Sequence, residues 1–119
     1  MPQYMLLMYD DPAAGPAEGS PEDQAEFAGW MSYTDQMAQA GIMRAGEALH
    51  PVSTATTVRV RGDERVVSDG PFAETKELLG GYYVIDVPDL DTALEWAGKA
   101  PHIEHGSVEV RPVMVFDQG

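Results

Sequence analysis

The first group of side chains that could do acid–base chemistry is centred on Glu47. This residue stands in a mostly apolar run over residues 43–49, and strand alternation would turn it to the same side as positions 43, 45 and 49. A carboxylate on an apolar face is costly unless it is paired. Glu47 is therefore expected to be either a catalytic general acid or base, or half of a buried structural ion pair. Its candidate partners are Lys76, Arg111 and His50.

The second candidate is the segment 69–72, with the sequence Asp-Gly-Pro-Phe. Glycine tolerates positive φ and proline fixes its own φ, so the segment predicts a rigid turn. In a functional interpretation the turn lines a pocket, with Asp69 as a catalytic carboxylate and Phe72 as an apolar wall. In a structural interpretation Asp69 caps the backbone of the turn and Phe72 fills the core. Glu74 and Lys76 follow the turn and would offer charges of both signs to a ligand.

The three histidines give weaker signals. His102 and His105 have the spacing His-x-x-His, which a metal site could use on a helix. Pro101 and Gly106 flank this pair, so we expect a solvated loop and no metal site. His50 precedes a proline at the end of a predicted strand. It is either an acid–base group beside the first cluster or a polar residue that closes the strand.

Four strands and two helices must position these side chains. Ser20 and Asp89 are typical helix N-caps, and Gly41 and Gly98 would end the two helices. The predicted elements are strand 3–9, helix 21–40, strand 42–49, hairpin strands 56–61 and 64–68, strand 81–87, helix 90–98 and strand 107–116. This order predicts an α+β fold in one domain over residues 1–119. The fold is the ferredoxin-like βαββαβ type with an inserted β-hairpin, and both helices lie on one face of an antiparallel sheet.

Apolar periodicity predicts which helix faces meet the sheet. The stripe of the first helix is Phe27, Trp30, Met31, Thr34, Met37 and Ala38, and that of the second is Leu90, Ala93, Leu94 and Ala97. Gly80-Gly81 at the entry to a strand predicts a bulge or close backbone packing. The first strand is apolar on both faces, so its helix-free side needs a cover. A second copy in an isologous homodimer is the simplest one.

Composition narrows the classes of function. The chain has 119 residues, no cysteine and a formal net charge of −13, so direct nucleic-acid and anionic-membrane partners are disfavoured. There is no signal-like or membrane-spanning run, and we expect a cytoplasmic protein. The sequence has no phosphate-binding loop, dinucleotide fingerprint or nucleophile elbow. We therefore expect no cofactor, and a small organic molecule as the ligand.

The stretch 67–87, from Val-Ser-Asp-Gly-Pro-Phe to the strand after Gly80-Gly81, resembles the signature of the DGPF-domain branch of the YCII-related family. The resemblance extends over nearly the whole chain. It implies a dimeric α+β barrel, a superfamily that includes isomerases, dehydrochlorinases and monooxygenases. Some YCII-type relatives are thought to use a His–Asp pair with the histidine in the first helix. Here that position is occupied by Trp30, which would line an apolar ligand pocket or fill the core.

Two functions are compatible with this resemblance. One is a cofactor-free enzyme that acts on a small molecule by carboxylate acid–base chemistry. The other is a noncatalytic ligand-binding or regulatory module, because DGPF relatives are often encoded beside alternative sigma factors. The candidate ligand-binding residues are Trp30, His50, Phe72, Glu74, Lys76 and Arg111.

Overall fold

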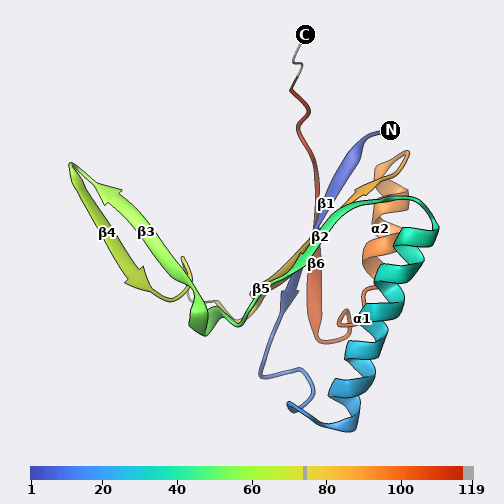
Figure 1. Cartoon of the computed structure of the whole chain (residues 1–119), viewed down its shortest axis with the longest axis horizontal. Coiled ribbons are helices and arrows are strands. Elements are labelled where there is room, and N and C mark those ends of the chain that lie inside the picture. Colours follow the sequence, from blue (N-terminus) through green and yellow to red (C-terminus); the bar gives the residue numbers. More distant parts are fainter. Residues whose placement is uncertain (74, 117–119) are drawn as a thin grey trace.

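The main sheet has four antiparallel strands with both helices on one face (Figure 1). A computed structural model describes residues 1–73 and 75–116. The strand order is β2-β5-β1-β6. The elements are β1 (Gln3–Asp10), α1 (Pro21–Gln39), β2 (Met43–Ala48), β5 (Leu78–Asp86), α2 (Leu90–Gly98) and β6 (Gly106–Pro112). Without the inserted hairpin this is the predicted ferredoxin-like βαββαβ arrangement.

The inserted hairpin forms a separate two-stranded sheet. A short 3₁₀ helix, η1 (Val52–Thr54), leads from β2 into strands β3 (Thr56–Arg61) and β4 (Glu64–Asp69). The hairpin projects from the side of the main sheet opposite the helices (Figure 1). At its base Gly70 has a φ of 101°, which favours glycine and confirms the predicted turn.

Both helices begin at the predicted caps. The Ser20 Oγ accepts a hydrogen bond of 3.1 Å from the backbone N–H of Asp23, and the Asp89 Oδ1 accepts one of 2.9 Å from Thr92 N–H. These bonds satisfy backbone donors that have no partner within the first turn. Gly41, with a φ of 71°, follows the end of α1.

The core lies between the helices and the sheet. Alternation along β1 turns Leu6 and Met8 toward the helices. The core residues are Leu6, Met8, Tyr33, Met37, Ile85, Val87, Ala93, Ala97 and Ala100. The Tyr33 hydroxyl donates a 2.7 Å hydrogen bond to the Trp96 carbonyl oxygen, and so joins α1 to α2. Burial, with a smaller contribution from Tyr83, raises the pKa of Tyr33.

The predicted helix stripes are only partly right. Phe27 and Met31 are mostly exposed, and Leu90 and Leu94 are about half exposed. The core uses Tyr33 and Met37 near the C-terminal half of α1, and the small Ala93 and Ala97 of α2. Alanines let α2 approach the sheet closely, and the larger leucines on its flanks stay at the surface. The stripe over the N-terminal half of α1 faces a cavity instead of the core.

Two strand boundaries also differ from the prediction. Strand β5 begins at Leu78 because Leu78 and Leu79 already pair with β1. The register then skips Gly80, which is the predicted bulge. A Cβ on Gly81 would lie 2.7 Å from the Glu47 carbonyl oxygen, which confirms the predicted close packing. Strand β6 ends at Pro112, one further hydrogen bond of 2.8 Å runs from Val113 N–H to the Gln3 carbonyl oxygen, and residues 114–116 are exposed.

No helix in the described part of the chain is long and apolar enough to cross a membrane.

Candidate functional site

A cavity of about 430 Å³ opens between the N-terminal half of α1 and the main sheet. Its volume lies within the range of about 300–1,000 Å³ that is typical of small-molecule pockets. Phe27 and Met31 are 66% and 63% exposed and form its rim. The apolar wall comes from β1, α1, β2 and β5 and consists of Met8, Phe27, Trp30, Met31, Met43 and Tyr83. The cavity suits the largely apolar part of a small organic molecule.

Two aromatic rings form the flat part of this wall. Trp30 and Tyr83 stack with their centroids 6.5 Å apart and their planes 15° apart. Tyr33 meets both rings edge-on, and the Tyr83 hydroxyl shares a 2.7 Å hydrogen bond with the Thr34 hydroxyl. Gly46 makes room for the ring, since a Cβ there would lie 2.8 Å from Tyr83 Cδ1. The ring positions are therefore fixed before any ligand enters.

Two carboxylates at one end of the cavity hold a histidine between them, and His105 itself lines a neighbouring groove and not the cavity. The His105 Nδ1 lies 2.8 Å from Asp10 Oδ1, and its Nε2 lies 2.7 Å from Glu26 Oε2. Asp10 ends β1, Glu26 lies in the second turn of α1, and both line the cavity. Burial lowers the pKa of His105, but hydrogen bonds and charges from Glu26 and Asp10 outweigh it, so that the pKa is raised. The arrangement favours an imidazolium paired with carboxylates.

His102 lines the same cavity and is only 2% exposed. Its Nε2 lies 3.2 Å from the Ser107 carbonyl oxygen. A carbonyl oxygen can only accept, so Nε2 carries a proton and donates this hydrogen bond. Nδ1 is buried and has no hydrogen-bond partner among the described residues. The Trp30 ring covers the imidazole at a centroid distance of 5.0 Å.

The expectation of solvated histidines at 102 and 105 is wrong. The loop turns back on itself through hydrogen bonds from the N–H groups of His105 and Gly106 to the His102 carbonyl oxygen. This turn places both rings under the N-terminal half of α1. A signal was present in the sequence, because the first and last strands of a βαββαβ fold pair with each other. Asp10 and Gly106 are register partners, which brings His105 to the end of β1.

Glu47 does not face the core, contrary to the prediction. Arg44 is an extra residue in β2, since Met43 pairs with Ile85 and Ala45 with Val84. This bulge reverses the alternation, and Glu47 pairs with Tyr82 on the helix-free side. Glu47 is exposed, and no hydrogen bond or ion pair of its side chain occurs among the described residues. Glu47 nevertheless borders the cavity.

The other predicted site residues do not converge. Asp69 is exposed at the end of β4, where it pairs with Thr56. Phe72 is 77% exposed, so it does not fill the core. The predicted ion pairs to Glu47 are absent from the described residues, and His50 is exposed. Trp30 does line the cavity, which agrees with the first of the two roles expected for it, pocket lining or core filling.

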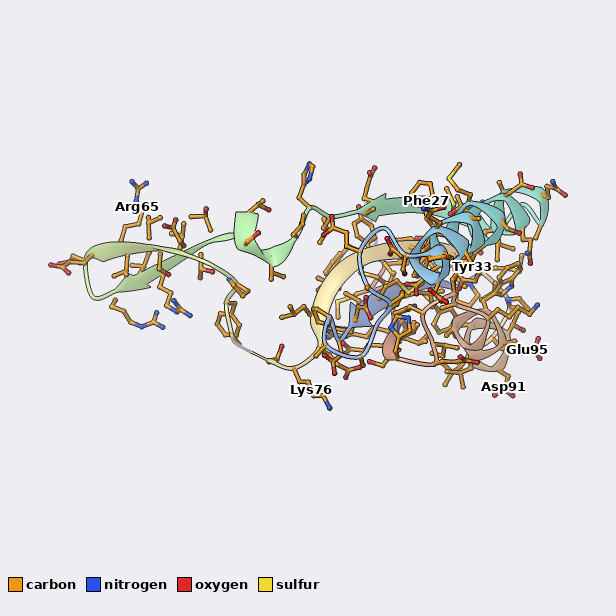
Figure 2. The ribbon with its side chains drawn as sticks, turned by 90° about the horizontal axis from the view of Figure 1, so that it is seen from below. Phe27, Tyr33, Arg65, Lys76, Asp91 and Glu95 are labelled. Atoms are coloured by element: carbon orange, nitrogen blue, oxygen red, sulfur yellow. The ribbon has the colours of Figure 1, made fainter. Side chains whose placement is uncertain are left out.

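The predicted basic partners of Glu47 lie elsewhere. The Lys76 Nζ is 3.6 Å from Asp11 Oδ2, and the Lys76 side chain is 84% exposed; Figure 2 shows it at the margin of the molecule. The Arg111 Nε is 4.0 Å from Glu109 Oε2 at the surface of β6. The Arg111–Glu109 pair is exposed at both ends, and such pairs contribute at most about 1 kcal/mol. Glu74 lies outside the described residues.

Fold and cavity together define a small α+β domain of the ferredoxin-like type with an aromatic pocket beside its first helix. The YCII-related domain model matches residues 2–117, so the chain belongs to the YCII-related family. It is 36% identical over 118 residues to an uncharacterised protein of Rhizobium meliloti (strain 1021). That similarity covers 98% of this chain and 95% of the relative.

Proposed function

We propose that this protein is a cofactor-free enzyme that moves a proton on a small, largely apolar organic molecule bound in the cavity. The observation that carries the proposal is the Asp10–His105–Glu26 cluster at the end of an aromatic pocket. Carboxylate acid–base chemistry was expected from the sequence, and the proposal assigns it to Glu26 and Asp10 in place of Glu47 and Asp69.

Glu26 is the best-placed proton acceptor. Its side chain is 17% exposed, compared with 43% for that of Asp10, and it lies one helical turn before Trp30 on the same face of α1. His105 donates to the Glu26 carboxylate and holds it at the cavity wall. Because Asp10 binds the opposite ring nitrogen, the imidazole is fixed in position. His105 is thus a positioning residue, and Glu26 is the group that meets the ligand.

His102 contributes to the wall of the cavity and not through a free polar atom. Its Nδ1 has no hydrogen-bond partner among the described residues, but this atom is closed off from solvent beneath the Trp30 ring. A ligand would reach it only if that ring moved. The stacked rings of Trp30 and Tyr83 would take a planar group.

The proposed activity is tested with carbonyl compounds that carry an acidic α-hydrogen. These compounds are first screened for binding, which is detected as an increase in the melting temperature of the protein. Exchange of that hydrogen in D₂O is then followed by proton NMR, so that no product need be known. We expect Glu26→Gln to slow exchange by about 10²–10⁴-fold, the usual contribution of a general base. Glu22→Gln is the matched control, because Glu22 is an exposed residue of the same helix outside the cavity.

The noncatalytic module is the second candidate, favoured by the predominantly apolar wall of the cavity. Ligands that bind in the cavity without any catalysed exchange would establish the module and refute the enzyme. Catalysed exchange that is equal in Glu26→Gln would refute only the role of Glu26 as the base.

We further propose that the protein acts in the cytoplasm as a homodimer. Supporting the dimer, Met5, Leu7, Tyr82 and Val84 lie on the helix-free side of the sheet and are only partly buried. An isologous partner would cover this apolar surface.

A further inference from the structure

The hairpin carries a bare apolar face. Residues 56–69 form the arm, which consists of β3, β4 and the turn between them. Val58 pairs with Val67, and Val60 lies two residues from Val58 on the same side of β3. Val58, Val60 and Val67 are 58%, 61% and 54% exposed, respectively. Valine on a strand is normally packed against another layer, which this face lacks.

The opposite face of the arm is partly covered by the chain itself. The Arg59 guanidinium lies 5.4 Å from the centroid of the Phe72 ring, and its Nη2 donates a 2.8 Å hydrogen bond to the Phe72 carbonyl oxygen. The Thr57 hydroxyl donates a 2.7 Å hydrogen bond to the Gly70 carbonyl oxygen. The return segment therefore contacts this face, although Val66 on it is still 41% exposed, and it leaves the face of the three valines uncovered.

An isolated two-stranded hairpin is at best marginally stable in water. The described hydrogen bonds of the arm run between its own strands or to the segments at its base. A partner that covers the valine face would provide the missing layer.

The distribution of charge favours a second copy of this chain as that partner. The arm would contact the body of that copy, which is the chain without residues 56–69. The arm holds three of the seven basic residues (Arg59, Arg61, Arg65) and three of the twenty acidic ones (Asp63, Glu64, Asp69). The rest of the chain has four basic and seventeen acidic residues, so it carries the whole net charge of −13. The neutral arm can approach an acidic body with little repulsion, and Arg65, the register partner of Val60 on the valine face, can pair with its carboxylates.

The direction of the arm fits the same partner. It projects on the side of the helix-free sheet face, and Arg65 lies far out from the body (Figures 1 and 2). A strand of six residues reaches about 20 Å at roughly 3.4 Å per residue. An arm of this length extends past the sheet face onto a molecule that covers it.

We infer that the arm docks, through Val58, Val60 and Val67, on the body of a second copy of this chain. The inference rests on the proposed homodimer and adds a second contact to it. In an isologous pair each copy gives one arm and receives one, so a single symmetry operation covers both apolar surfaces of each chain.

A spin label locates the arm directly. The chain has no cysteine, so Asp63→Cys at the arm turn gives one labelling site. Spin-labelled protein is mixed with ¹⁵N-labelled wild type, and only contacts between copies broaden the ¹⁵N signals. We expect broadening of amides in the body of the wild-type copy. If light scattering shows a dimer but no such broadening occurs, the arm contact is refuted and the dimer is not. If light scattering shows a monomer, both are refuted.

Two valine variants test the face. We expect Val60→Glu to raise the dimer dissociation constant by at least about tenfold, which corresponds to about 1.4 kcal/mol. Val66→Glu is the matched control, because Val66 pairs with Arg59 on the face opposite the three valines, and it should change the constant by less than about threefold. Equal effects of the two variants would rule out the valine face. Circular dichroism melting checks that both variants fold.

Discussion

His105 is the residue whose charge depends most directly on its neighbours. Its folded-state pKa is raised above about 6.5, the value of an unperturbed histidine, by Glu26 and Asp10 against the opposing effect of burial. A raised folded-state pKa means that the folded protein binds the proton more tightly than the unfolded chain does. The stabilising contribution is full below about pH 6.5, and it is lost as the pH rises through the folded-state pKa.

His105→Gln should therefore lower the free energy of unfolding more at about pH 6 than at about pH 9. Urea unfolding at the two pH values measures both differences. His50→Gln is the control, since His50 is exposed and lies outside the cavity. A cost of His105→Gln that is equal at the two pH values would show that the imidazole is neutral throughout.

At the scale of elements, β2 shapes the cavity through one glycine and one bulge. The bulge at Arg44 turns Glu47 away from the helices, and Gly46 leaves the space that the Tyr83 ring occupies. A Cβ on Gly46 would meet Tyr83 Cδ1 at 2.8 Å, a distance at which the ring has to move. Movement of the ring would disturb both its stack on Trp30 and its hydrogen bond to Thr34.

Gly46→Ala should accordingly destabilise the protein by about 1–3 kcal/mol, as overpacking does, and weaken binding of any ligand of the cavity. Gly98→Ala is the comparison: it adds the same methyl group at the end of α2, where no atom lies within 4 Å of the new Cβ. It should be neutral or stabilising by up to about 1 kcal/mol. Thermal melts of the two variants measure these changes in stability. A similar loss of stability in both variants would contradict the close contact at Tyr83.

At the scale of the whole molecule, net charge opposes association. Each chain carries −13, and in the proposed dimer two acidic bodies meet. Salt screens such repulsion, with a Debye length of about 30 Å at 0.01 M and about 8 Å at 0.15 M. The arm is the neutral segment through which the two copies can approach.

Raising the salt concentration from about 0.01 M to about 0.15 M should therefore strengthen the dimer. Analytical ultracentrifugation over a concentration series gives the dissociation constant at each salt level. A dimer that weakens with salt would mean that attraction between arginines of the arm and carboxylates of the body exceeds the overall repulsion.

Local sequence signals determined the elements of this protein. Ser20 and Asp89 begin the helices, Gly41 follows the first, and the hairpin strands fall where turn residues bound them. These signals act within a few residues, through hydrogen bonds and φ preferences that any chain with this sequence would have. The element order then left the ferredoxin-like arrangement as the natural way to bury two apolar helix stripes.

Tertiary structure decided the site. Asp10, Glu26 and His105 are 16 and 79 residues apart along the chain, and only the pairing of β1 with β6 and the packing of α1 bring them together. Simple alternation also failed at Glu47, because a single extra residue reverses which side of a strand each later side chain faces. A bulge depends on the partner strand, so the side of the sheet that a residue faces is fixed by long-range pairing and cannot be obtained from its neighbours in sequence.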